Sequence, residues 1–238
     1  MIAPDKNRLL ALQQLALRFG LSESDLPRID WNLLHQALIH PSYAADFGSN
    51  LDNDRLEFLG DEILRFITAE FLYRAYPSEA VGQLTAVRSV LVSDKVLAEW
   101  AAESNLGKAL LVSKGTLQEG RGENTRLADG FEAVIGALYL STGNIDLIVP
   151  WLQPKLASLA HKVIADPVKG NYIGALQEQT QKLYQCLPDY LLFGAEPPFT
   201  CEVRIQGKLC GVGEGKSKKV AQQVAAQIAF EQLESESS

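Results

Sequence analysis

The spacing of apolar residues changes near residue 166, and this change constrains the fold more than any other feature. Before it, apolar side chains recur at helical intervals, as in Ile63, Phe66 and Ile67. After it, residues 199–205 alternate between apolar and polar side chains, as a half-buried strand does. Proline, glycine and asparagine cluster between these regions. We therefore predict an all-α domain over residues 1–165, a linker over 166–171 and a small α+β domain over 172–238.

The small domain has an α-β-β-β-α order. The expected elements are a helix over 173–183, strands over 188–193, 199–205 and 209–212, and an Ala-rich helix over 218–233. Gly207-Lys208 is a plausible hairpin turn, and the polar tail 234–238 reads as disordered.

Composition narrows the possible partners. The formal net charge of −7 excludes a uniformly basic nucleic-acid coat, so any RNA or DNA site must be a local patch. The 3 cysteines lack the spacing of a zinc site or a disulfide framework. With neither a secretion signal nor a membrane-length apolar run, we expect a cytoplasmic protein without a membrane partner.

Carboxylates at helical spacing carry the chemistry. Glu57 and Asp61 are one turn apart in the segment 53–61, and Asp54 extends the same face. Asp129 and Glu132 form a second co-facial pair on an otherwise apolar helix. If the two helices pack together, their oxygens suit Mg²⁺ or Mn²⁺ and hydrolysis of a phosphodiester. Taken alone, either pair is more often a solvated helix face.

Small residues leave the packing of these helices open. Gly60, Gly130, Ala133 and Gly136 would permit close helix contact, although glycine more commonly interrupts a helix.

A basic edge lies in the small domain. Between Lys208 and Lys219 there are four lysines and one acid, Glu214. The segment 211–221 follows a strand and opens a helix, which brings backbone N–H groups and lysines together as an anion site. It lacks P-loop spacing, so we expect no nucleotide cofactor; phosphates of a nucleic acid suit it better. The alternative is a solvated helix start with solubilising lysines.

Several segments resemble one known family. Residues 53–61 resemble the NERLEFLGD signature of ribonuclease III, 127–133 resemble its second acidic block, and 37–43 resemble its AL-x-H-x-S block. The C-terminal part is similar to a double-stranded-RNA-binding domain in residues 176–178, the strand 199–205, the motif 211–219 and the Ala-rich helix. Together these segments span nearly the whole chain.

The resemblance implies a role for each matching position. It makes Glu57, Asp61, Asp129 and Glu132 metal ligands, with Asp61 and Glu132 catalytic, and Asp54 an accessory acid. It implies RNA contacts from a set on the small domain: Gln177, Glu178, Lys216, Ser217, Lys218 and Lys219. It also implies Mg²⁺, with Mn²⁺ as a substitute, and a homodimer in which each site cuts one strand.

The sequence departs from the family pattern at two positions and in one loop. Asp54 stands where the family usually has glutamate, and Val81 where many relatives carry a carboxylate. The loop 194–199 lacks the histidine of the usual GPxH-type loop.

The expected function is hydrolysis of double-stranded RNA in rRNA and mRNA processing, to 5′-phosphate and 3′-hydroxyl products with 3′ overhangs. Two alternatives remain: a non-catalytic double-stranded-RNA-binding protein, and a small-molecule phosphohydrolase, which would leave the lysine-rich domain without a purpose.

Overall fold

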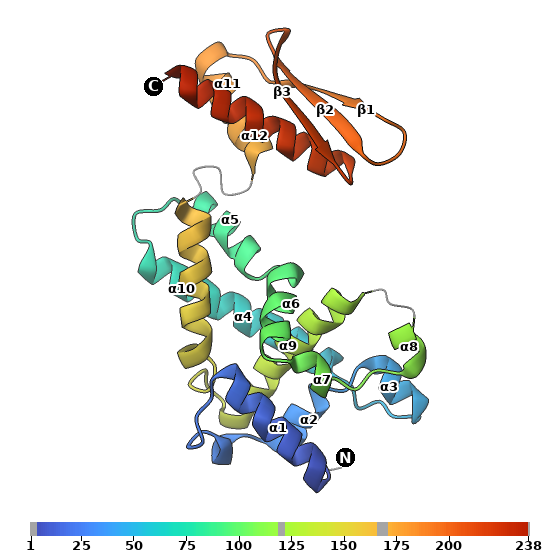
Figure 1. Ribbon diagram of the computed structural model, residues 1–238. Helices are drawn as coiled ribbons and strands as arrows, with labels where there is room; N and C mark the ends of the chain where they lie inside the picture. The colour runs from blue at the N-terminus through green and yellow to red at the C-terminus, as the bar shows by residue number, and fades with distance from the viewer. Residues whose placement is uncertain (1–3, 119–121, 166–170, 238) are drawn as a thin grey trace. The chain divides into compact units, whose positions relative to one another are not determined.

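Two compact units make up the chain. The computed structural model describes residues 4–118, 122–165 and 171–237. The units are Met1–Lys162 and Val163–Ser238; the first is helical and the second contains the sheet (Figure 1). The predicted linker, 166–171, lies outside the described residues apart from Asn171. The Asn171 side chain accepts a hydrogen bond from the Gly174 amide and caps the first helix of the second unit.

Helices form the whole regular structure of the first unit within the described residues, as predicted. They are α1 (Lys6–Phe19), the 3-10 turn η1 (Leu26–Arg28), α2 (Trp31–Gln36), α3 (Pro41–Asp46), α4 (Asp54–Ala75), α5 (Val81–Leu91), α6 (Asp94–Glu103), α7 (Leu106–Ala109), α8 (Lys114–Gln118), α9 (Glu123–Thr142) and α10 (Val149–Ala165). None of these described helices, nor those of the second unit, is both long and apolar enough to cross a membrane.

Glycines let the two long helices α4 and α9 pack in close contact. A Cβ on Gly60 of α4 would overlap the backbone oxygen of Glu132, and one on Gly136 of α9 would overlap the backbone oxygen of Leu56. The helix backbones therefore touch where the acidic motifs lie. Of the two uses that the sequence left open for these glycines, close packing is the one realised.

Phe131 fixes the rotation of α9. Its side chain is fully buried, and its ring centroid lies 5.6 Å from that of Phe19, 5.8 Å from Trp151 and 6.1 Å from Trp100. A large aromatic residue held by three others cannot turn away without opening the core. Its neighbours Gly130 and Glu132 are placed accordingly.

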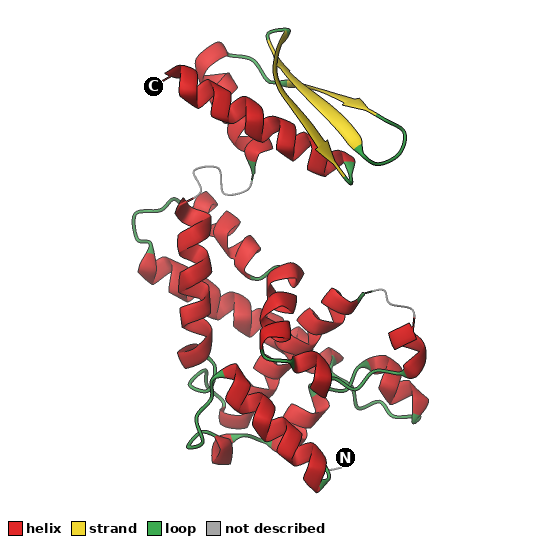
Figure 2. Ribbon diagram, viewed as in Figure 1, coloured by secondary structure: helices red, strands yellow, loops and turns green. Residues whose placement is uncertain are grey.

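The second unit has the predicted α-β-β-β-α order (Figure 2). Its elements are α11 (Tyr172–Tyr184), β1 (Asp189–Phe193), β2 (Phe199–Ile205), β3 (Lys208–Gly215) and α12 (Lys218–Ser237). The strands are antiparallel in the order β1-β2-β3, and α12 packs against the sheet and against α11. Alternate β2 residues, Cys201, Val203 and Ile205, enter the core, as the alternating pattern predicts.

The hairpin between β2 and β3 turns one residue earlier than predicted. Gln206 and Gly207 have φ of 51° and 82°, and Ile205 pairs with Lys208. Two central residues with positive φ suit the right-handed twist of the flanking strands. Lys208 thus belongs to β3 and not to the turn.

The third strand is longer than the predicted 209–212, because β3 continues to Gly215. Gly211, Gly213 and Gly215 lie within β3 and pair with β2. A Cβ on Gly213 would overlap the Ala225 amide nitrogen of α12, so these glycines serve close packing of strand against helix.

The tail also differs from expectation. Residues 234–237 continue α12, and the predicted disorder therefore does not hold for these four residues; Ser238 lies outside the described residues.

Candidate metal and active site

Three carboxylates meet where α4 and α9 touch. Glu57 of α4 and Asp129 and Glu132 of α9 each offer an oxygen, and these oxygens lie within 4.8 Å of one another. The two acidic pairs, 72 residues apart between Glu57 and Asp129, are brought together by the glycine contact. All three side chains are partly buried, so the group is neither a solvated helix face nor a sealed core.

All three clustered carboxylates have raised pKa values. Burial raises the pKa of Glu57 to about 7 and of Glu132 to about 8, with repulsion from neighbouring carboxylates adding to both shifts. Burial and the charges of Asp94 and Asp54 raise the pKa of Asp129 to about 6. Anionic carboxylates at this spacing repel one another unless a cation lies between them. The arrangement is therefore suited to a divalent cation.

Asp61, the fourth predicted ligand, lies beside this group but points to another partner. The Arg65 Nε donates to Asp61 Oδ1 at 2.7 Å and to Oδ2 at 2.8 Å. The Asp61 charge still reaches Glu57 and Glu132, whose pKa values it helps to raise. The structure thus gathers three of the four predicted ligands and pairs the fourth with an arginine.

Two further acids contribute charge to the site. Asp54 is exposed at the first turn of α4, and its charge raises the pKa of Glu57 and Asp129. Asp94, in the first turn of α6, raises the pKa of all three clustered carboxylates. Sequence reasoning missed Asp94 because it stands alone, without a co-facial acid, and only the packing of α6 against α9 brings it near.

The predicted RNA-binding residues lie on the surface of the second unit. Gln177 and Glu178 are exposed on α11, and Lys216, Ser217, Lys218 and Lys219 are exposed at the start of α12. Ser217 also has a structural role, because its Oγ accepts a hydrogen bond from the Val220 amide and so caps α12. The Lys218 ammonium lies 5.9 Å from the centroid of the Phe199 ring, a cation–π distance.

Comparison with known proteins resolves the family. A Ribonuclease-III-like family model matches residues 30–147, and a double-stranded RNA binding motif matches residues 172–233. The chain is 58% identical to the Ribonuclease 3 of Gloeobacter violaceus over 96% of its own length and 93% of that protein. The chain belongs to the ribonuclease III family.

Two further ribonuclease III proteins are similar to this chain, one in sequence and one in fold. The chain is 40% identical to the Ribonuclease 3 2 of a Nostoc species, over 97% of this chain and 94% of that protein. Its fold matches the nuclease domain of Campylobacter jejuni ribonuclease III with a TM-score of 0.50 and 31% identity, covering 63% of this chain and 96% of that domain. The predicted family and fold class are confirmed. Ribonuclease III enzymes are generally metal-dependent, and the acidic cluster fits that dependence.

One of the family-pattern departures lies at a helix start. Val81 begins α5, and its side chain is 80% exposed, so no packing requirement explains an apolar residue there.

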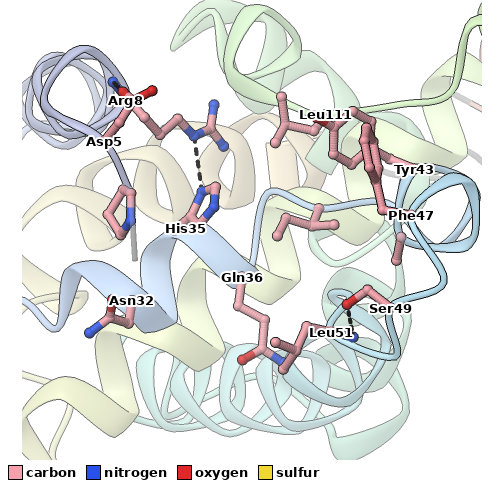
Figure 3. Close-up of a pocket in the computed structure, with 13 residues that line it drawn as sticks. Asp5, Arg8, Asn32, His35, Gln36, Tyr43, Phe47, Ser49, Leu51 and Leu111 are labelled. Atoms are coloured by element: carbon pink, nitrogen blue, oxygen red, sulfur yellow. Dashed lines mark hydrogen bonds between the residues drawn. The ribbon is translucent and has the colours of Figure 1, made fainter. Parts of the chain in front are cut away.

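A separate cavity of the nuclease unit lies between α1, α2 and α3 (Figure 3). It measures about 400 Å³ and is lined by Arg8, His35, Tyr43 and Phe47 among others, but by none of the predicted site residues. Arg8 donates from Nε to His35 Nδ1 at 3.0 Å and from a terminal nitrogen to the Ala109 carbonyl at 2.7 Å. These bonds tie α1 to α2 and to the end of α7, a structural role.

Proposed function

We propose that this chain is an endoribonuclease that hydrolyses double-stranded RNA to 5′-phosphate and 3′-hydroxyl products with 3′ overhangs, using Mg²⁺. The observation that carries the proposal is the convergence of Glu57, Asp129 and Glu132 at the contact of α4 and α9 in a ribonuclease III chain. In the reaction a water adds its hydroxyl to phosphorus, the bond to the 3′ oxygen breaks, and that oxygen takes up a proton.

The donor set fits a hard divalent cation. Its donors are carboxylate oxygens, which Mg²⁺ and Mn²⁺ prefer, whereas zinc sites favour thiolates and imidazoles. We assign Glu57, Asp61, Asp129 and Glu132 as ligands, with Asp61 and Glu132 orienting the attacking water. A bound ion would supply Lewis acidity and lower the pKa of a water. Asp54 adds negative charge beside the ligands.

The second unit supplies the affinity for RNA. Lys216, Lys218 and Lys219 suit phosphates, while Gln177 and Glu178 offer polar groups that can reach the 2′-hydroxyls of a shallow groove. Because the whole chain carries a net charge of −7, binding depends on this local edge. Recognition of A-form shape rather than base sequence follows from such contacts.

A homodimer is the proposed working form. Phe58, Phe66 and Tyr73 recur at two-turn intervals along α4 and are 75%, 59% and 75% exposed. Phe58, Leu59 and Ile63 form one apolar side of α4 in the sequence. Of these three residues only Ile63 is buried in the structure, which leaves Phe58 available to a partner subunit.

A hollow of about 620 Å³ beside the same helix, lined in part by Phe58, Leu59 and Leu140, offers a matching socket. A two-fold axis would place each protruding ring against the partner's hollow. The Campylobacter jejuni nuclease domain is itself described as having a region involved in dimer formation. Phe58→Ala should shift the mass measured by light scattering toward the monomer; an unchanged dimer would contradict this interface.

The proposed setting is processing of rRNA and mRNA precursors in the cytoplasm, with Mn²⁺ able to replace Mg²⁺. Free thiols at Cys186, Cys201 and Cys210 suit a reducing compartment.

The test compares wild-type protein with Glu132→Gln on end-labelled duplex RNA, matched single-stranded RNA and duplex DNA, with Mg²⁺ or with EDTA. We expect Mg²⁺-dependent cleavage of the RNA duplex alone, and at least about 100-fold slower cleavage by Glu132→Gln. RNA affinity should be nearly unchanged, because glutamine has the same shape as glutamate and Glu132 lies outside the basic edge of the second unit.

One rival function makes a different prediction. A non-catalytic double-stranded-RNA-binding protein would bind the duplex and cut nothing, with wild type and Glu132→Gln indistinguishable. Equal loss of binding and cleavage in Glu132→Gln would instead contradict the division of labour between the two units.

A further inference from the structure

The cluster of carboxylates in the nuclease unit has a positive neighbour of its own. Arg65 follows Asp61 by one helical turn on α4, and its Nε reaches both Asp61 oxygens at 2.7 and 2.8 Å. The Arg65 side chain is 48% exposed and the Asp61 side chain 26%. Glu62 and Glu132 also act electrostatically on Arg65. The Arg65 guanidinium therefore neutralises part of the negative charge at the edge of the acidic site.

This pairing opposes the ligand role of Asp61. Both carboxylate oxygens accept from the same arginine N–H, whereas a ligand must direct at least one oxygen to a cation. A cation that takes an Asp61 oxygen as ligand therefore competes with Arg65 for the same charge.

We propose that Arg65 competes with the divalent ion for Asp61, and so acts as a positioning residue that weakens metal binding and holds Asp61 aside until the ion displaces it. This inference rests on the proposed function and deepens it. The ion pair is partly exposed and joins residues at i and i+4, a class of contact that is weak and readily exchanged. The competition therefore raises the metal concentration needed for half-saturation but does not block the site.

The chain provides a matched control on the same helix. Arg74 pairs with Glu70 at the same i,i+4 spacing and the same 2.7 Å distance, with side chains 75% and 37% exposed. Neither residue belongs to the carboxylate group. Removing Arg74 deletes an equivalent ion pair from α4 without touching Asp61.

The experiment measures Mn²⁺ binding to the metal-free full chain by titration calorimetry and by the loss of the free Mn²⁺ paramagnetic resonance signal. We expect Arg65→Gln to bind Mn²⁺ about two- to tenfold more tightly than wild type. Arg65→Lys, which keeps the charge, should stay close to wild type, and Arg74→Gln should match it. An unchanged or weaker affinity in Arg65→Gln overturns the proposal.

A double-mutant cycle separates competition for Asp61 from a general effect of removing positive charge. In an Asp61→Asn background, Arg65→Gln should no longer tighten Mn²⁺ binding. A gain that persists in that background would mean that Arg65 acts through its field alone, and would overturn the proposed competition.

The outcome also distinguishes this proposal from the one on which it rests. Wild-type protein that takes up Mn²⁺, loses that binding in Glu132→Gln and is unaffected by Arg65→Gln would refute the role of Arg65 and leave the nuclease site standing. Wild-type protein that takes up no Mn²⁺ and cuts no duplex would refute both.

Discussion

Glycine brings backbones into contact in both units, but with different consequences. In the nuclease unit, Gly60 and Gly136 let two helices touch. In the second unit, Gly211, Gly213 and Gly215 let strand β3 lie against α12. The first contact joins carboxylates from distant parts of the chain. The second buries alanines and leaves the lysines at the start of α12 on the surface.

The difference matches what each unit is proposed to bind. A compact cation needs several oxygens within a few ångströms, which the close packing of α4 and α9 provides here. A phosphate backbone needs separate positive charges that remain in water, so the packing beneath them has only to hold the helix in place. Substitutions at each close contact test whether it serves its own site and no other.

The largest effect is expected from Gly60→Ala. The added Cβ would overlap the Glu132 backbone, so α4 and α9 must move apart. This movement separates Glu57 on α4 from Asp129 and Glu132 on α9. We expect the nuclease unit to lose about 3 kcal/mol or more of unfolding free energy and most of its cleavage activity. Urea denaturation followed by tryptophan fluorescence measures this, since Trp31, Trp100 and Trp151 all lie in that unit.

Gly82→Ala is the control for this substitution. Gly82 lies in α5, and a Cβ added to it would meet no atom of the described residues within 4 Å, so alanine there should be neutral or slightly stabilising. If Gly60→Ala were as mild as Gly82→Ala, the close helix contact would not be what holds the site.

Gly213→Ala should damage the second unit by a similar route. Its Cβ would overlap backbone atoms of Ala221 and Ala225, which forces β3 away from α12. We expect about 2 kcal/mol or more of destabilisation in that unit and loss of duplex affinity, measured by gel shift. Mn²⁺ binding to the nuclease unit should persist.

Val212→Ala, at a 43% exposed neighbour on the same strand, serves as the control. Loss of Mn²⁺ binding in Gly213→Ala would contradict the independence of the two contacts.

The sequence predicted the elements better than their contacts. Alternation in 199–205 and helical periodicity elsewhere reflect local burial, and the structure follows both. The predicted strand ends at residue 212 because glycine is typical of loops, whereas Gly213 and Gly215 continue β3 and pack against α12. Nothing local distinguishes those two uses.

The candidate site shows the same limit. Co-facial spacing singles out Glu57, Asp61, Asp129 and Glu132 as one possible group, and the structure brings all but Asp61 together. The partnership of Asp61 with Arg65 depends on a choice of side-chain direction, and the influence of Asp94 depends on how α6 packs on α9. The i,i+4 spacing allows the first contact without showing that Asp61 takes it in place of the carboxylate group. The second is a tertiary fact that no spacing rule contains.

A smaller effect is expected from removing surface charge. Lys218→Ala with Lys219→Ala should weaken duplex binding about tenfold and make its salt dependence shallower, because each phosphate contact releases counterions. Affinity measured at several salt concentrations gives the slope, and cleavage at saturating RNA should be preserved. An unchanged slope would contradict the placement of the RNA surface at the start of α12.

The smallest effect concerns the pH dependence of stability in EDTA. The folded-state pKa of Glu132 is about 8, raised by burial and neighbouring carboxylates from an ordinary 4.5. Between these values the folded protein retains a proton that the unfolded chain has released, so the stabilising contribution falls as pH rises through the folded pKa. The proton on Glu132 therefore makes its full contribution to the free energy of unfolding below about pH 4.5. That contribution decreases as pH rises and is lost by about pH 8.

The measurement is the difference in unfolding free energy between Glu132→Gln and wild type across this range. Burial lowers the pKa of His35 and His40, so their ionisation at acidic pH changes stability in the opposite direction in both proteins and cancels in the difference. Because Glu132 is partly exposed, we expect the variant to gain about 1 kcal/mol relative to wild type between pH 5 and pH 8. Saturating Mn²⁺ should abolish this gain, since the cation then neutralises the carboxylates in the wild type. A difference that stays flat with pH would mean that the crowding of carboxylates does not strain the metal-free nuclease unit.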